Sequence, residues 1–353
     1  MKRLIITICV LFGTMPMLAQ DYPILNEKDR PQYNIFNHLD AAVTLGTTGI
    51  GVEVASPVTN WAQLRLGYAF MPRFHYHMNF EVQVGDTKES KYDANGNRVE
   101  TKFDKMAALL EDLSGYKVND EVEMIGRPTY HNLKVMVDVF PFQNDKRWHV
   151  TTGFFLGPSK IADGYNVTEA MPSLLALGMY NRLYDKAMVS YESVQKFRKG
   201  EIPPYDIIPI FSIGQYEINS PTEIETLYKM MHSNGRMGMP LGKKTDENGI
   251  SYTYMMEPNE DGMVKAEVIT NSFKPYLGVG YGSRLLKNDD RFHVAVDLGA
   301  MFWGGSPRII THDGTDLAKD VHDINSQVGD YVEVIKGFNI FPVLEIRLVY
   351  SIF

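Results

Sequence analysis

The chain has 353 residues, of which 44% are hydrophobic and 22% are charged, so it is neither a disordered chain nor a helical membrane protein. Its formal charge of −8 argues against a nucleic-acid-binding protein, because binding to phosphates normally requires a basic surface. Aromatic residues make up 12% of the chain, and it contains 29 glycines and a single cysteine. This composition favours a β-protein with tight turns.

The first 19 residues have the pattern of a secretory signal peptide. A basic pair precedes the apolar run 4–12, and the small residue Ala19 precedes the expected cleavage site. The run is too short to span a membrane. Cys9 lies inside it, so we expect no disulfide in the mature chain. Residues 20–38 are then expected to form an N-terminal periplasmic segment.

Period-2 alternation of apolar with small or polar residues, the signature of β-strands, begins soon afterwards. In the segment 39–56 the alternation changes phase across residues 46–49, which indicates either a turn or a β-bulge. We expect a turn, which gives two short strands and eight strands in total, whereas a bulge would give seven. The later strands are expected at 62–70, 132–141, 148–157, 273–284, 291–303 and 340–352.

The connections between these strands indicate a transmembrane β-barrel, because short turns alternate with long polar segments. The short turns lie at 57–60, 143–147 and 287–290, and the long segments at about 75–130, 160–270 and 308–337. Outer-membrane barrels have short periplasmic turns and long outer loops. We therefore expect an all-β, antiparallel up-and-down transmembrane β-barrel over residues 39–353, located in the cell outer membrane. The alternative is a soluble exported β-protein with the apolar faces packed inside.

The long segments contain apolar residues at helical spacing. We expect helices at 101–116, 166–198, 221–232, with Ser220 as N-cap, and 316–334. These helical extracellular insertions are expected to fold over the mouth of the barrel. The 160–270 insert is either a surface domain that binds an extracellular ligand or protein, or a decoration that shields the barrel.

The polar faces of the strands are expected to point into the lumen and to carry a charge network with a structural role. Its members are Glu53, Arg65, Lys134, Asp138, Lys274, Arg284, Asp297, Glu345 and Arg347. The basic and acidic residues nearly balance, and an eight-stranded barrel is just wide enough for side chains to fill. We therefore expect a lumen closed by salt bridges, with an ion path as the alternative.

No catalytic, cofactor-binding or metal site is predicted. His149 and His293 can face the lumen, but the spacing pairs neither with a nucleophile and a third polar group. His75 and His77 share one strand face, but no third ligand accompanies them in the sequence. The glycines of 46–51 do not form a nucleotide loop, since no helix follows.

Several strands resemble a family of small Gram-negative outer-membrane β-barrels. The matching stretches are LGTTGIGVE (45–53) with LRLGY (64–68), PYLGVGYG (275–282), VDLG (296–299) leading to Gly305-Ser306-Pro307, and Phe341-Pro342 before the terminal Phe353. The resemblance implies an eight-stranded, porin-like or OmpA-like barrel, and the loops look like those of Bacteroidetes proteins. It implies that the terminal Phe353 is read by the assembly machinery. The family has a second aromatic residue two positions earlier, where this chain has Ser351, so Tyr350 is expected to take part in barrel closure and the assembly signal together with Phe353. It implies no activity.

The expected function is that of an integral outer-membrane protein with a structural or surface-interaction role and no enzymatic activity. The alternatives are a narrow porin-like channel for small solutes and a lipid-modifying barrel enzyme. The expected partners are outer-membrane lipid, the barrel assembly machinery and an extracellular ligand or protein bound by the 160–270 insert. No nucleic acid and no cofactor are expected.

Overall fold

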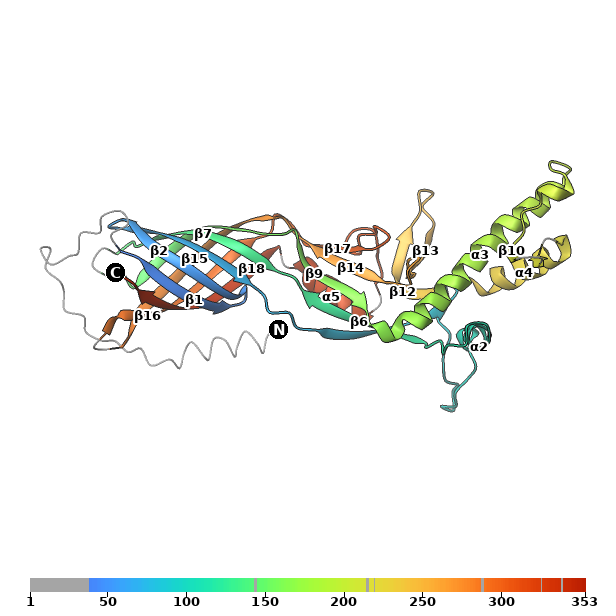
Figure 1. Cartoon of the computed structure of the whole chain (residues 1–353), viewed down its shortest axis with the longest axis horizontal. Helices are drawn as coiled ribbons and strands as arrows, with labels where there is room; N and C mark the ends of the chain where they lie inside the picture. Colours follow the sequence, from blue (N-terminus) through green and yellow to red (C-terminus); the bar gives the residue numbers. More distant parts are fainter. Residues whose placement is uncertain are drawn as a thin grey trace, which may run out of the picture.

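The computed structural model describes residues 38–142, 145–213, 216–218, 220–286, 289–324, 326–337 and 339–353. The predicted signal peptide and nearly all of the predicted periplasmic segment lie outside these residues. The molecule is elongated, with a closed barrel at one end, open sheets in the middle and helices at the other end (Figure 1). None of the helices in the described residues is both long and apolar enough to cross a membrane.

Within the described residues, a closed barrel is formed by eight antiparallel strands. They are β1 (Asp40–Gly46), β2 (Gly49–Thr59), β3 (Ala62–Phe70), β7 (His131–Val139), β8 (Trp148–Leu156), β15 (Phe273–Leu286), β16 (Asp289–Phe302) and β18 (Ile340–Ser351). In the order given, each strand pairs with the one before it and the one after it, and β18 closes the ring by pairing with β1. The predicted up-and-down barrel of eight strands is confirmed.

The segment 39–56 is a hairpin, which explains the change of phase in its sequence. Thr47 and Thr48 form the turn between β1 and β2, with Gly46 opposite Gly49. Gly49 has a φ of 101°, a conformation that favours glycine. The apolar residues of both strands consequently share the outer face of the barrel, where Val43 pairs with Val52.

Five of the barrel strands are continued beyond the barrel by an open sheet. In spatial order its strands are β17 (Arg308–Thr311), β14 (Lys265–Ile269), β9 (Lys160–Asn166), β6 (Glu121–Pro128) and β4 (Tyr76–Glu81). They adjoin β16, β15, β8, β7 and β3 in the chain, so this sheet repeats the order of that arc. On the remaining side, the other three barrel strands, β18, β1 and β2, are not continued by strands of the open sheet, and β1 and β2 are joined by a tight turn. Helix α5 (Ser326–Gly337) packs there, and its Tyr331 hydroxyl lies 2.6 Å from that of Tyr76.

The far end of the molecule combines a small sheet with helices. The sheet contains β13 (Ser251–Met256), β12 (Met237–Thr245) and β5 (Gln83–Val84). The helices are α2 (Lys102–Ser114), α3 (Met171–Arg198) and α4 (Pro221–Asn234), accompanied by the 3-10 turns η2 (Thr168–Ala170) and η3 (Pro204–Asp206) and the short hairpin β10 (Phe211–Ile213) and β11 (Tyr216–Ile218). Tyr191 of α3 stacks on Tyr228 of α4 at 3.7 Å between ring centroids. One hydrophobic core runs from the open sheet into these helices.

The helix predictions are correct in part. Helices α2, α3 and α4 confirm the predictions at 101–116, 166–198 and 221–232, although the side chain of Ser220 makes no capping hydrogen bond. The predicted helix at 316–334 is wrong in its first half, since α5 begins at Ser326. The expectation that the helices fold over the barrel mouth is also wrong, because α2, α3 and α4 lie beyond the open sheet (Figure 1). The strands of that sheet separate them from the barrel.

Candidate functional site

The outer surface of the barrel is a continuous apolar belt. Its exposed side chains include Val43, Leu45, Val52, Leu66, Leu133, Leu277, Val279, Leu298, Ile346 and Leu348. Exposed aromatic side chains occupy the strand ends, among them Phe70, Trp148, Phe273, Phe302 and Tyr350. A belt of this size would be unfavourable in water. An apolar band flanked by aromatic residues is the surface of a barrel that spans a lipid bilayer.

Two ion pairs cross the lumen from wall to wall. Arg65 of β3 lies 3.0 Å from Asp297 of β16, and these two strands stand opposite each other in the ring of eight. Lys134 of β7 lies 2.6 Å from Glu345 of β18, another pair of opposite strands. Both pairs are buried. They form two struts across the interior, which we call the lumen struts.

Further charged groups join the two lumen struts into one network. Glu53 lies 2.5 Å from the Lys134 amino group and 3.4 Å from the Arg65 guanidinium. Asp138 lies 3.0 Å from Arg65, and Arg347 lies 2.7 Å from Asp297. All these side chains are buried, and each has at least one partner of opposite charge. Pairing of this kind offsets the desolvation cost of burying such charges, which would otherwise be large.

The structure adds two residues of β8 to this network. The Thr151 hydroxyl donates to Asp138 at 2.7 Å and accepts from Arg65 at 3.3 Å. The His149 ring lies 2.7 Å from Asp297 and 3.2 Å from Arg347. Side chains alternate between the two faces of a strand, which places both residues on the inward face of β8. This alternation was the one sequence feature that pointed to Thr151.

Two of the nine predicted lumen charges do not join the network. Lys274 is fully buried near the end of the barrel that carries the long loops, where it donates to Asn132 Oδ1 at 3.3 Å. Arg284 is exposed, so its predicted place in the lumen network is wrong. The reason is the length of β15, which has 14 residues and extends past the packed interior. Its pairing with β16 also changes register between Arg284 and Leu286.

An apolar layer closes the lumen a second time, on the side of the long loops. It contains Tyr130, Met136, Phe155, Tyr276, Met301, Trp303 and Val343. Trp303, which follows β16, stacks on Phe341 of β18 at 5.1 Å between ring centroids. The cavity between this layer and the ion pairs measures about 10 Å³. Such a volume holds at most about one water molecule.

The end of the chain completes the barrel wall. Ile352 donates to the Leu39 carbonyl at 2.8 Å, and the Leu39 amide donates to the Phe353 carbonyl at 3.1 Å. Tyr350 faces outward beside Phe292, with 5.0 Å between ring centroids, and Phe353 is exposed at the rim. The predicted closing strand is therefore the closing strand in the structure, and the role of Tyr350 and Phe353 as an assembly signal stays a prediction.

Two of the four histidines considered for catalysis or metal binding, His149 and His77, have acidic or basic side chains as partners. In the part of the chain that the structure describes, His149 contacts Asp297 and Arg347, and no serine or cysteine hydrogen-bonds to its ring. His77 lies 2.6 Å from Glu123 on the neighbouring strand. These contacts arrange no nucleophile beside a general base.

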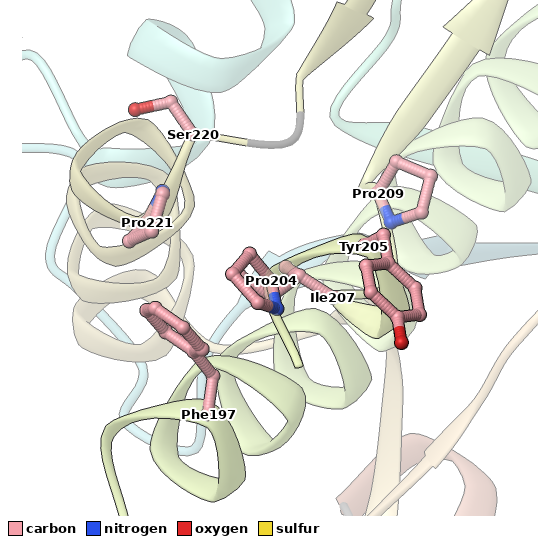
Figure 2. Close-up of a pocket in the computed structure, with 7 residues that line it drawn as sticks. All are labelled: Phe197, Pro204, Tyr205, Ile207, Pro209, Ser220 and Pro221. Atoms are coloured by element: carbon pink, nitrogen blue, oxygen red, sulfur yellow. The ribbon is translucent and has the colours of Figure 1, made fainter. Parts of the chain in front are cut away.

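The far end of the 160–270 insert contains a pocket, shown in Figure 2. Its volume is about 420 Å³, and it is lined by Phe197, Pro204, Tyr205, Ile207, Pro209, Ser220 and Pro221. The lining residues come from the end of α3, the η3 turn and the start of α4. The sequence reading missed this site, because no chemical motif marks it.

The chain was compared with known families, curated proteins and solved structures. It matches no protein-family model and no curated protein. Among solved structures it is similar to CarO2 of Acinetobacter baumannii, with 11% identity, a TM-score of 0.35 and coverage of 90% of this chain and 99% of that one. It is also similar to CarO of Acinetobacter baumannii (11% identity, TM-score 0.34, 88% and 96% coverage). A major outer membrane protein from Thermus thermophilus matches at 10% identity, with a TM-score of 0.21 and coverage of 89% and 98%. Likeness at this level carries no functional information to this chain.

Proposed function

We propose that this chain is an outer-membrane β-barrel protein with a closed lumen, which anchors a protruding loop unit for contact with partners outside the cell and catalyses no reaction. This proposal rests on the distribution of apolar and charged residues in the barrel. Apolar residues such as Val52 and Leu298 are exposed outside, while charged residues such as Arg65 and Asp297 are buried inside. A protein surrounded by water would have the opposite arrangement.

A closed lumen is supported by the packing of its interior. A hydrated ion would have to break both lumen struts and then pass the apolar layer around Tyr276 and Trp303. The cavity between these layers measures about 10 Å³, which is room for about one water molecule at most. This geometry favours a structural anchor over a narrow porin-like channel.

A surface-interaction role is supported by the shape of the insert. Helix α3 alone has 28 residues, which corresponds to a length of about 42 Å at 1.5 Å per residue. The helices lie at the end of the molecule farthest from the barrel (Figure 1), and the pocket at the end of α3 belongs to this unit (Figure 2). The unit therefore presents its binding surface away from the membrane.

Planar-bilayer recordings test the closed lumen. Purified protein that shows a heat-modifiable gel shift, and is therefore folded, is expected to give no steady conductance above background. A porin reconstituted in the same bilayers controls for insertion and sensitivity. Reproducible open-channel steps from the folded protein would contradict the closed lumen and favour the porin-like channel.

A further inference from the structure

The pocket at the end of α3 is built from rigid elements. The loop from Pro204 to Pro209 is fixed to α3, because the Ile208 amide donates to the Ser193 hydroxyl at 2.9 Å. The ends of α3 and α4 are joined by an ion pair of 2.6 Å between Arg198 and Glu225. Prolines at three of the lining positions further restrict the backbone. The pocket is therefore largely formed before any ligand arrives, which lowers the entropy cost of binding.

The chemistry of the lining selects the kind of ligand. None of the seven lining residues carries a charge, and most of their side chains are apolar rings or branched chains. Only the hydroxyls of Ser220 and Tyr205 offer polar side-chain atoms, and the Ser220 side chain makes no capping bond to α4. A cavity of about 150 Å³ already accommodates a benzene ring. The pocket, at about 420 Å³, has room for a larger aromatic group and its flanking backbone.

The surroundings of the pocket indicate a protein as the source of that group. Tyr205 is 86% exposed and Ile208 is 47% exposed, so apolar surface continues outside the cavity. Arg198, next to Phe197 in the chain, and Glu225, one helical turn after Pro221, form a charged pair beside this apolar centre. An apolar centre with exposed tyrosine and a charged rim has the anatomy of a protein-protein hot spot. A free small molecule would leave Ile208 uncovered.

We propose that this pocket binds an aromatic side chain of a partner protein, which enters between Phe197, Pro204 and Pro221 while Tyr205 and Ile208 contact the partner surface around it. The proposal specifies the ligand class for the surface-interaction role proposed above and rests on it. The location of the barrel and its closed lumen do not depend on the pocket, so a failure here leaves those conclusions intact.

Binding of minimal probes to the full mature chain in detergent tests the pocket. N-acetyl-phenylalaninamide is expected to bind saturably with a Kd of about 1 mM, the range for a fragment of this size, while methyl glucoside gives no saturable signal by ligand-observed NMR. Ser220→Phe replaces the smallest lining side chain with a bulky ring at the edge of the pocket and is expected to weaken binding at least tenfold. Ser233→Phe, near the other end of α4, is the matched control and leaves binding unchanged. Phe197→Ala removes a wall and provides a second test if Ser220→Phe misfolds.

A longer probe tests the source of the aromatic group. The peptide Ac-Ala-Ala-Phe-Ala-Ala-NH2 is expected to bind several-fold more tightly than the amide, and Ile208→Ser is expected to abolish this gain without changing binding of the amide. Equal affinity of peptide and amide would assign the pocket to a free aromatic molecule and overturn the protein partner. Absence of saturable binding of the amide, or saturable binding that Ser220→Phe leaves unchanged, would overturn the site itself.

Discussion

The guanidinium of Arg65 and the carboxylate of Asp297 meet at 3.0 Å although their strands stand on opposite walls of the barrel. The same Arg65 also contacts Glu53 and Asp138. Loss of this one side chain would remove a buried guanidinium that Glu53, Asp138 and Asp297 share. Removal of one partner of a buried ion pair is far more destabilising than removal of an exposed charge.

Arg65→Met is therefore expected to lower the free energy of unfolding by about 3 kcal/mol or more. The measurement is urea unfolding from lipid vesicles, followed by tryptophan fluorescence. Arg308→Met is the matched control, because Arg308 is exposed at the start of β17, and its effect should stay within about 0.5 kcal/mol. Equal effects of the two substitutions would show that the lumen struts do not stabilise the barrel.

The orientation of the barrel predicts which positions are accessible from outside the cell. The chain contains a single cysteine, Cys9, inside the predicted signal peptide, so introduced cysteines report without interference. Tyr205→Cys at the far end of the insert should react with a membrane-impermeant maleimide on intact cells. Asn60→Cys, in the β2–β3 turn at the opposite end, should react only after the outer membrane is opened. The reverse pattern of labelling would invert the topology.

Deletion of residues 350–353 is expected to prevent barrel closure. This deletion removes the bonds between Leu39 and the chain end and the pairing of Tyr350 with Ala41. In lipid, each backbone group left unsatisfied costs several kcal/mol. Folded protein in the outer membrane, read as a heat-modifiable gel shift, should fall far more than after deletion of 246–249 in the β12–β13 turn. A full shift in the 350–353 deletion would show that this segment is not needed for closure.

Alkaline pH is expected to loosen the insert at Tyr254. Burial raises the pKa of Tyr254 to about 12, and its hydroxyl donates to Asp313 at 2.8 Å. The raised pKa means that the folded insert favours the neutral phenol. The contribution of this phenol to the free energy of unfolding is therefore complete below about pH 10 and is lost as the pH rises from about 10 through 12. Tyr254→Phe should reduce this loss of stability between pH 10 and 12, measured by urea unfolding followed by circular dichroism at a series of pH values. Identical alkaline profiles for the two proteins would contradict the assignment.

The charge network shows which features of the candidate site could be predicted from the sequence. Alternation along each strand correctly placed Glu53, Arg65 and Lys134 inside, because side chains of successive strand residues point to opposite faces. Parity does not tell how far along the barrel a residue lies. Arg284 has an inward position by parity, but it lies near the end of a long strand and is exposed.

The sequence by itself determined the local structure of this protein. Period-2 alternation located the barrel strands, the phase change at residues 46–49 located the β1–β2 turn, and helical spacing located α2, α3 and α4. These features follow from backbone geometry over a few residues, so they are readable without the fold.

Only the tertiary structure decided which distant residues meet. Arg65 and Asp297 are 232 residues apart, and their contact depends on the order and stagger of eight strands around the barrel. The open sheet that carries the insert away from the barrel, and the pocket between Phe197 and Pro221, likewise depend on long-range pairing. Periodicity assigns a residue to a face, but the partner across that face is set by how the whole sheet closes.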